Sequence, residues 1–399
     1  MILPQLTWRM LRGASFRTLW KLGLNCGLAN VRAIRRFNKG LKAGEVFPPF
    51  LFLSITNKCN LHCQGCWVAV DAPKTELSLD ELATIIAAAR KRKCRFFGIL
   101  GGEPLLHEGL LDLFGRHRDC TFQLFTNGTL ITPEIAKQLR ALANVTPLIS
   151  IEGGASVSDI RRGGSDVLER SLAGLENCVR EKLFTGVATS LCKSNLDELC
   201  SEAWLDELIR RGALYAWYYL YRPAGAEPHV ELALDADEIT RARRFIVEQR
   251  CKKPIMIVDS YWDAKGRALC PAATGISHHV SPAGFIEPCP PIQFARDHIH
   301  DNDDDLAKTL TESKFLADFR RFAAEQTRGC VLLDCPDKLA DFLDDHDARD
   351  TSLRGATTDD LRALPLLPCH HIPGEEIPEK HWMYRFAKKH WFFGFGAYG

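Results

Sequence analysis

The hydrophobic pattern between residues 51 and 220 alternates short β-rich runs with helical stretches. The first run, Leu-Phe-Leu-Ser-Ile-Thr at 51–56, is followed by five comparable ones. Such alternation predicts βα units built around a parallel sheet. The pattern predicts strands at 51–56, 95–100, 121–126, 146–151, 184–191 and 214–220, with helices at 78–92, 108–118, 132–143, 166–182 and 197–211.

Six βα repeats in this span are too few for a closed eightfold barrel, which usually needs about 250 residues. The pattern therefore predicts an α/β fold, a partial (βα)6 TIM-like barrel that remains open. In barrels of this kind the chemistry lies at the C-terminal ends of the strands.

The rhythm weakens after Pro223-Ala224-Gly225, where Pro-rich and acidic segments begin. We expect a smaller, irregular C-terminal module that contains several cysteines. The predicted division is a basic N-terminal extension at 1–45, the barrel at 46–225, the C-terminal module at 226–369 and an aromatic, basic tail at 370–399.

The N-terminal extension carries nine Lys or Arg residues against one acid, Glu45, with Trp8, Phe16 and Trp20 interleaved. A basic amphipathic helix with aromatic anchors suits the surface of an anionic bilayer. The alternative is a helix packed on the barrel with a solvated basic face. The tail either caps the barrel or joins the extension at a membrane or partner surface.

Composition narrows the class of protein. The 399 residues are 46% hydrophobic, enough for a substantial core, and the net charge of +1 argues against a nucleic-acid duplex as partner. Fifteen cysteines without a signal peptide favour a reducing, cytoplasmic setting in which some thiols bind metal. No apolar run reaches the roughly 18 residues of a spanning helix, so the protein is soluble or rests peripherally on a membrane.

Three cysteines follow the first predicted strand with the spacing C-x3-C-x2-C: Cys59, Cys63 and Cys66. Three thiolates on so short a loop can hold three irons of a [4Fe–4S] cluster, and the fourth iron then stays open to a small molecule. A structural zinc site is the alternative, but zinc wants four closed ligands, and His62 is awkwardly placed to be the fourth. Three buried cysteines without a metal are the remaining alternative.

This loop resembles the defining motif of the radical S-adenosylmethionine (SAM) superfamily, which stands at the end of the first barrel strand. The resemblance implies a [4Fe–4S] cluster and SAM as cofactors, with an electron donor such as flavodoxin or ferredoxin. In that family the reduced cluster cleaves SAM to a 5′-deoxyadenosyl radical, which abstracts hydrogen from the substrate. One departure is Gly65, because the family often has an aromatic residue just before the third cysteine.

The next strand ends extend the resemblance. Gly101-Gly102-Glu103-Pro104 is similar to the family's GGEP motif, where glycines let the backbone approach SAM. An arginine, Arg162 or its neighbour Arg161, resembles the basic residue near the SAM carboxylate. Ordinary turns and a solvated arginine are the alternatives. The SAM contacts implied by the resemblance are Gly101, Gly102, Glu103, Pro104, Thr126, Asn127, Ser150, Glu152, Arg162 and Ser190.

A second set of cysteines lies in the C-terminal region. The pattern C-x13-G-x4-C from Cys270 through Gly284 to Cys289 resembles the opening of the SPASM or twitch module, although the chain lacks the later cysteine run of a complete SPASM module. We expect one auxiliary iron–sulfur cluster with Cys369 as a substitute ligand; structural zinc is the alternative. The expected ligands are Cys270, Cys289, Cys330 and Cys335.

Other residue types offer weaker signals. The pairs His278-His279 and His370-His371 suit metal or acid–base roles, but such histidines are more often loop residues. The aromatic residues around the sixth strand either line a substrate cavity or pack the barrel. They are Tyr215, Trp217, Tyr218, Tyr219 and Tyr221. No catalytic residue can be assigned from these patterns.

The resemblance implies a radical SAM enzyme that modifies a C–H bond of a peptide or protein, a substrate class frequent among enzymes with such C-terminal modules. The N-terminal extension is expected to be too short for a leader-peptide-binding domain. The alternative substrate is a lipid or isoprenoid, suggested by the basic, aromatic ends of the chain. A non-enzymatic iron–sulfur or zinc-binding protein is the third possibility.

Overall fold

A nine-stranded sheet forms the centre of the protein in the computed structural model, which describes residues 2–390 and the side chains of all of these except residues 25 and 26. The strand order is β7-β6-β5-β4-β3-β2-β1-β8-β9, and of these pairs only β8 with β9 is antiparallel. A small separate sheet pairs β10 with β11. The strands are β1 Phe50–Ser54, β2 Phe96–Leu100, β3 Thr121–Thr126, β4 Val145–Ser150, β5 Gly186–Leu191, β6 Tyr215–Leu220, β7 Met256–Val258, β8 Ser277–Val280, β9 Ile286–Glu287, β10 Phe294–Ala295 and β11 Arg349–Asp350.

The six predicted strands are β1 to β6, and the predicted partial, open barrel is confirmed. Within residues 2–390 no pairing joins the edge strands β7 and β9, so the sheet stays open. The pattern missed β7 and β8, which extend the parallel sheet beyond β6 and β1. The strand β7 is apolar but has only three residues, and β8 contains two histidines, so neither gives a long hydrophobic run. The proposed domain division at residue 225 stays a prediction, although β8 joins the central sheet.

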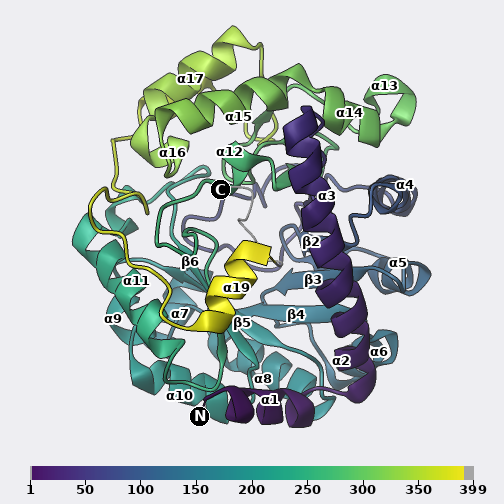
Figure 1. Ribbon diagram of the computed structural model, residues 1–399, viewed down its shortest axis with the longest axis vertical. Coiled ribbons are helices and arrows are strands. Elements are labelled where there is room, and N and C mark those ends of the chain that lie inside the picture. The colour runs from purple at the N-terminus through teal and green to yellow at the C-terminus, as the bar shows by residue number, and fades with distance from the viewer. Residues whose placement is uncertain (1, 391–399) are drawn as a thin grey trace.

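Helices surround the sheet (Figure 1). The helix predicted over 197–211 is broken into α9 and α10 at Cys200, and Ser201 caps the second helix by accepting the Trp204 N–H. Helix α7 was not predicted. The helices are α1 Ile2–Gly13, α2 Phe16–Lys21, η1 Leu22–Leu28, α3 Ala29–Ala43, α4 Leu79–Lys91, η2 Pro104–Leu106, α5 Leu110–Arg116, α6 Pro133–Leu142, α7 Ala155–Arg162, α8 Val167–Arg180, α9 Leu196–Leu199, α10 Glu202–Arg210, η3 Val230–Leu232, α11 Ala236–Gln249, α12 Pro271–Thr274, α13 Asp301–Asp304, α14 Leu306–Glu312, α15 Lys314–Gln326, α16 Val331–Asp334, α17 Pro336–Asp345, α18 Thr358–Arg362 and α19 Trp382–His390.

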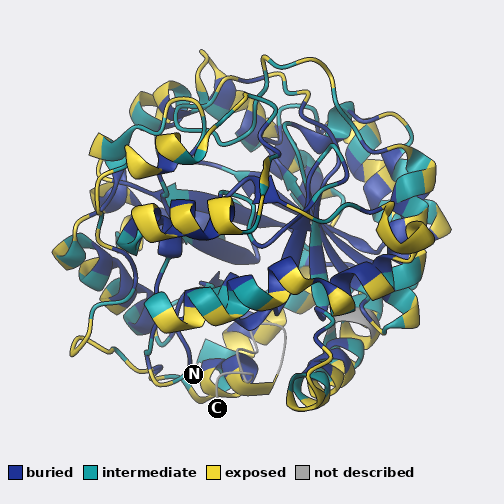
Figure 2. Cartoon of the chain, turned by 90° about the horizontal axis from the view of Figure 1, so that it is seen from above, coloured by how far each residue is buried: buried dark blue, intermediate teal, exposed yellow. Residues whose placement is uncertain are grey.

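The core lies between the outer face of the sheet and the helices that cover it. Figure 2 shows the strands buried at the centre and helices with exposed outer faces around them. Leu53, Ile99 and Leu124 point outward into this core and are fully buried. The opposite, inner face is aromatic, with the rings of Phe52 and Phe125 6.1 Å apart. This alternation of faces leaves the inner face available for a cavity.

The N-terminal helices pack against the barrel. Arg9 on α1 donates hydrogen bonds to the carbonyls of Ile209 (3.1 Å) and Ala213 (2.8 Å). Ala14 packs with inner-face residues of the sheet, and Phe37 on α3 is buried beside Val46. The extension is thus a docked part of the fold, which was one of its two predicted interpretations.

The C-terminal region supplies helices α14 to α17 at one end of the sheet and helix α19 on the face nearest the viewer (Figure 1). No helix between residues 2 and 390 combines the length and apolar character that crossing a membrane requires. The part of the predicted aromatic tail beyond His390 lies outside the described residues.

Candidate active site

One cavity of about 430 Å³ opens at the C-terminal ends of the barrel strands. It brings together the two cysteine sets, although more than 200 residues separate them in the chain. Glu103, Pro104 and Cys335 are the predicted site residues that do not line it. Those that do are Cys59, Cys63, Cys66, Gly101, Gly102, Thr126, Asn127, Ser150, Glu152, Arg162, Ser190, Cys270, Cys289 and Cys330.

The first cysteine set sits on a tight loop. The Cys66 N–H donates to the Cys63 carbonyl at 3.1 Å. Burial raises the pKa of the Cys59 thiol to about 11 and that of Cys66 to about 12, and the nearby Cys63 thiol adds to both shifts. Thiols placed this way ionise when a cationic metal centre binds them. The donor set therefore fits an iron–sulfur cluster.

No group of three or more His, Cys, Asp or Glu side chains in residues 2–390 is arranged to hold one metal ion. A [4Fe–4S] cluster makes a different demand, because each thiolate binds a separate iron. Cys59, Cys63 and Cys66 all face the same cavity, as that demand requires. His62, which was considered as a fourth zinc ligand, instead contacts Asp71 on the surface, with 3.0 Å between Nε2 and Oδ1.

The structure explains the glycine that departs from the family pattern. Gly65 has φ +67°, and a Cβ atom there would lie 2.0 Å from the hydroxyl oxygen of Tyr221. Tyr221 directly follows β6, so its ring fills the space beside the cysteine loop. Gly163, at the end of α7, approaches so closely that a Cβ would lie 1.8 Å from the His62 carbonyl oxygen. The loop is thus held between α7 and the end of β6.

Glu103 lies behind the cavity wall. Its carboxylate accepts hydrogen bonds from the Thr126 hydroxyl (2.8 Å), the Leu105 N–H (3.1 Å) and the Asn127 N–H (2.8 Å). Burial raises the pKa of Glu103 to about 7. The Asn127 amide in turn donates to Asn60 at 2.8 Å. Glu103 therefore positions the end of β3 against the cysteine loop.

Arg162 and Glu152 form a buried pair at the cavity. Arg162 Nη2 donates to Glu152 Oε1 at 2.7 Å, and the Ser190 N–H donates to Glu152 Oε2 at 2.9 Å. Arg162 Nη1 also lies 3.7 Å from Cys63 Sγ. Arg161 faces the ring of Tyr221 at 4.9 Å. The structure thus separates the two arginines and places Arg162 next to the cysteines.

The second cysteine set converges from four loops. Burial raises the pKa of the Cys270 and Cys335 thiols to about 11, and the Cys330 thiol raises both further. Burial and the nearby thiols of Cys270 and Cys330 also raise the pKa of Cys289. Cys369, the predicted substitute ligand, donates a hydrogen bond to Asp334 Oδ2 at 3.1 Å. The Cys330 thiol thus raises the pKa of Cys270, Cys289 and Cys335, and also that of Cys369, so Cys330 lies near all four.

Arg222 was not singled out from the sequence. It directly follows β6. Its guanidinium carbon lies 4.7 Å from the centroid of the Tyr261 ring, and its Nη1 donates a hydrogen bond to the Tyr261 hydroxyl at 3.1 Å. Although burial opposes it, Tyr261 and the thiols of Cys330 and Cys289 raise the pKa of Arg222. Its place at the C-terminal end of a barrel strand was the one available signal.

The predicted aromatic wall is divided between two faces. Trp217, Tyr219 and Tyr221 line the cavity. Tyr218 points to the other face of the sheet, where its hydroxyl donates to the Leu199 carbonyl at 2.9 Å. Tyr215 lies deeper in the barrel, stacked on Phe184. The alternation of side chains along β6 causes this division.

The histidine pairs are also divided. His278 and His370 line the cavity, whereas His279 contacts Glu287 (2.5 Å) and Ser54 (2.7 Å). Burial lowers the pKa of His278 and of His370 to about 3. The backbone of Pro288 partly offsets this shift for His278 by a hydrogen bond that raises its pKa.

Known proteins resemble this chain in sequence. A family model described as "Radical SAM superfamily" matches residues 53–200. The AdoMet-dependent heme synthase of Methanosarcina barkeri is 32% identical over 157 residues, 38% of this chain and 45% of that protein. The mycofactocin maturase MftC of Mycolicibacterium smegmatis is 28% identical over 277 residues, 65% of this chain and 67% of that protein. The chain spans about half the length of the first curated relatives, between 44% and 56%.

The fold also matches a solved structure. Streptococcus suis SuiB bound to the precursor peptide SuiA superposes with a TM-score of 0.60 at 15% identity, covering 76% of this chain and 73% of SuiB. At this identity the likeness concerns the fold alone. The superposed part is a larger share of the chain than residues 1–225 make up, so the likeness extends past the barrel into the C-terminal region.

Proposed function

The chain belongs to the radical SAM superfamily, whose members are enzymes, and from that premise we propose that it cleaves SAM reductively to start radical chemistry at a substrate C–H bond. The observation that carries the proposal is the single cavity shared by the three loop cysteines and the glycine-rich end of β2. When bound, the [4Fe–4S] cluster supplies an electron to SAM, which yields methionine and the 5′-deoxyadenosyl radical.

The chain's own residues would hold and orient these groups. Cys59, Cys63 and Cys66 are proposed as the cluster ligands. Arg162 offers a guanidinium to the SAM carboxylate, and Glu152 fixes its direction. Gly101 and Gly102 present backbone to the cavity without side chains in the way.

The second cysteine set is proposed to bind an auxiliary iron–sulfur cluster through Cys270, Cys289, Cys330 and Cys335. Three of these line the same cavity as the loop cysteines. A cluster there would accept an electron from the reacting substrate or bind it directly. Flavodoxin or ferredoxin is the proposed electron donor.

We propose a peptide or protein as the substrate. Two findings support this class: SuiB, with its precursor peptide bound, shares the fold over 76% of this chain, and a protein named as a maturase matches 65% of it. A peptide side chain entering from solvent suits a cavity that is open on one side.

A lipid or isoprenoid is the second candidate substrate, and the cavity wall favours it. The rings of Phe52 and Phe125 lie 6.1 Å apart, and Phe125 lies 6.1 Å from Trp217, which stacks on Tyr219 at 5.4 Å. Such a continuous aromatic surface would accept an apolar chain.

The test of the activity is anaerobic reconstitution with iron and sulfide, reduction with dithionite in the presence of SAM, and assay of 5′-deoxyadenosine. We expect product from the wild type and none from Cys63→Ala. Cys178→Ala, which removes a fully buried thiol outside the cavity lining, is the matched control and should keep its activity. Product formation that survives in Cys63→Ala would contradict the proposal.

The substrate class needs a separate measurement. A peptide fraction and a lipid fraction are prepared from cells that produce this protein. Each is added to the reconstituted enzyme, and the two increases in the rate of 5′-deoxyadenosine formation above the basal rate are compared. Stimulation by the peptide fraction alone supports the first candidate, and stimulation by the lipid fraction alone supports the second.

A further inference from the structure

Helix α19 presents an inverted surface. A helix on a water-soluble protein normally buries its aromatic side chains and exposes its lysines. In α19, Lys388 is only 2% exposed, whereas Trp382 and Phe386 are each 57% exposed. They lie four residues apart and therefore on one outward face. The arrangement leaves an apolar surface pointing away from the protein.

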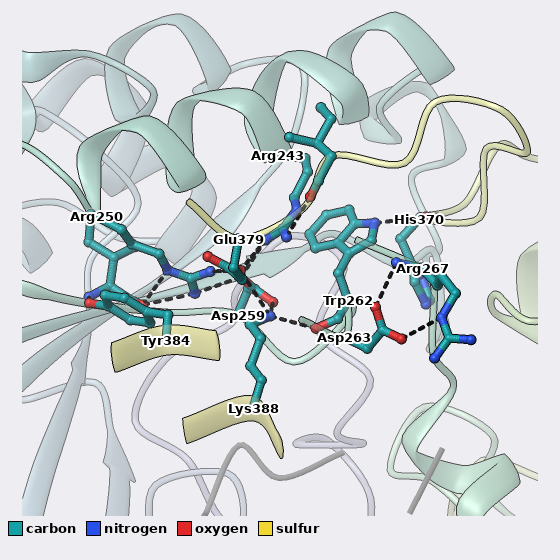
Figure 3. A network of polar contacts seen from close by, with 12 residues as sticks. Arg243, Arg250, Asp259, Trp262, Asp263, Arg267, His370, Glu379, Tyr384 and Lys388 are labelled. Atoms are coloured by element: carbon teal, nitrogen blue, oxygen red, sulfur yellow. Dashed lines mark hydrogen bonds and ion pairs between the residues drawn. The ribbon is translucent and has the colours of Figure 1, made fainter. Parts of the chain in front are cut away.

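The inner face of α19 is fixed by a buried polar network (Figure 3). Lys388 donates to Asp259 Oδ1 at 2.8 Å and to the Trp262 carbonyl at 2.5 Å. The Tyr384 hydroxyl accepts the Ile257 N–H at 2.9 Å. These contacts set the rotation of the helix, so the outward direction of Trp382 and Phe386 follows from the fold.

The N-terminal helices show the same inversion. Ser15 and Thr18 are buried and hydrogen-bonded to each other at 2.7 Å, while Phe16 is 79% and Trp20 60% exposed. Among the described residues ten large hydrophobic side chains are exposed, and all except Ile160 and Leu366 lie on α1, α2, η1 or α19. The other eight are Trp8, Leu11, Phe16, Trp20, Leu24, Leu28, Trp382 and Phe386.

Positive charge borders these apolar residues. Arg12 lies over the ring of Trp8 at 4.1 Å, and the only acid of residues 1–45, Glu45, is paired with Arg92. A second copy of this face would oppose like charges, so self-association is disfavoured. The exposed basic side chains lie on α1, α2 and α19 and on α3, which continues η1; they are Arg12, Arg17, Arg32, Arg35, Arg36, Lys39, Lys42, Arg385 and Lys389.

We propose that the outward faces of α1, α2, η1, α3 and α19 form a docking surface for an anionic lipid bilayer. Exposed Trp and Phe side chains enter the interface between headgroups and acyl chains, and the bordering arginines and lysines contact anionic headgroups. Helices α3 and α19 both lie on the near side of the sheet in Figure 1, so one surface can engage both ends of the chain. The proposal concerns where the enzyme works and is independent of the reaction proposed above.

The experiment is flotation of the full-length protein with vesicles of phosphatidylcholine alone or with about 30% phosphatidylglycerol. We expect binding to the anionic vesicles that weakens as salt is raised, because salt screens the headgroup charge. The double variant Phe16→Ser/Trp20→Ser should lose at least tenfold in vesicle affinity. Arg32→Glu/Arg36→Glu should lose a similar factor on anionic vesicles and show a weaker salt dependence, because fewer cations then face the headgroups.

Leu366→Ser is the matched control, because Leu366 is equally exposed but lies outside the docking surface, and it should float like the wild type. Circular dichroism melting of each variant establishes that the fold is intact. Equal flotation of the wild type and the Phe16→Ser/Trp20→Ser variant would overturn the proposal. The proposal would also be overturned if the wild type did not float and instead formed a stable dimer, or a complex with an added acidic peptide, and the same double variant abolished that association.

Discussion

Arg162 Nη2 donates a hydrogen bond to Glu152 Oε1 at 2.7 Å, and Nη1 of the same guanidinium lies 3.7 Å from Cys63 Sγ. The carboxylate of Glu152 thereby holds the Arg162 guanidinium in a fixed position beside the proposed cluster loop and the cavity. Since both side chains are buried, neither charge is screened by bulk water. This geometry makes Arg162 the first residue to test for SAM binding.

Replacing Arg162 should weaken SAM binding more than cluster assembly. Arg162→Lys keeps the charge but loses the planar fork, and we expect about tenfold weaker binding; Arg162→Ala should cost about a hundredfold, near 3 kcal/mol. Equilibrium dialysis with the reconstituted protein measures this, and the iron content of each variant is the control. Unchanged affinity in Arg162→Ala with full iron content would exclude the role.

Glu103 predicts a pH dependence of stability. Its folded pKa of about 7 exceeds the ordinary value of 4.5, so the folded state binds the extra proton between these values. Its contribution to stability is fully present below pH 4.5 and is lost as pH rises through 7. Between pH 6 and 8 the wild type should lose about 1.4 kcal/mol of unfolding free energy from this group.

Urea unfolding of the metal-free chain at both pH values measures that loss. Glu103→Gln cannot titrate and should show none of it. At pH 6 it should be close to the wild type in stability, because the protonated carboxyl and the amide each present one acceptor oxygen and one donor group to the same three hydrogen-bond donors. An equal pH dependence in both proteins would contradict the assignment to Glu103.

The barrel could be predicted from the sequence because β1 to β6 are local patterns. Each combines a hydrophobic run with a following helix, and the loop Cys59 to Cys66 is a contiguous motif. The placement of Glu103 could not be predicted, since its three donors depend on how β3 packs beside the turn after β2. Tyr221 is similar, because its contact with Gly65 joins segments more than 150 residues apart.

The second cysteine set gives a test of ligand identity. We propose Cys335 as the fourth ligand and Cys369 as its possible substitute, because the nearby Cys330 thiol raises the pKa of both. We expect Cys335→Ala and Cys330→Ala to lose about half of the bound iron, and Cys369→Ala to keep it. Iron and sulfide analysis with Mössbauer spectroscopy distinguishes the two clusters. Iron loss in Cys369→Ala, with Cys335→Ala unaffected, would reverse the assignment.

Arg222 should tune the reduction potential of the proposed auxiliary cluster. A buried cation beside Cys289 and Cys330 stabilises the more negative, reduced state. Arg222→Gln should therefore lower the midpoint potential, by on the order of 50–100 mV for one charge at this range in a protein interior. Redox titration followed by electron paramagnetic resonance measures the shift, and Arg222→Lys should retain most of the wild-type potential. A midpoint that stays constant in Arg222→Gln would show that the charge is compensated elsewhere.

The network beneath α19 joins sequence segments that local patterns could not connect. Arg243 lies on α11 and Arg250 directly follows it, Asp259 directly follows β7, and Glu379 and Lys388 come from the C-terminal region. The sequence predicted only a basic, aromatic tail there. That Lys388 points inward, while the aromatic residues point outward, depends on carboxylates supplied by the barrel.

Charge balance within that network decides which substitution costs more. Three cations, Arg243, Arg250 and Lys388, surround two carboxylates, so Lys388→Met leaves a neutral set, whereas Asp259→Asn leaves three cations with one carboxylate. We expect Asp259→Asn to cost about 3–5 kcal/mol of unfolding free energy and Lys388→Met distinctly less.

The network also predicts acid sensitivity, which the same two variants test. The neighbouring cations, Arg250 foremost, hold the pKa of Asp259 below its ordinary value despite burial. Its stabilisation is therefore present above the ordinary Asp pKa and is lost as pH falls below it. Urea unfolding at pH 7 and pH 3 should show a smaller acid-induced loss in Asp259→Asn than in the wild type. If Lys388→Met proves the more destabilising at pH 7, the buried amine contributes more through its contact with the Trp262 carbonyl than through charge.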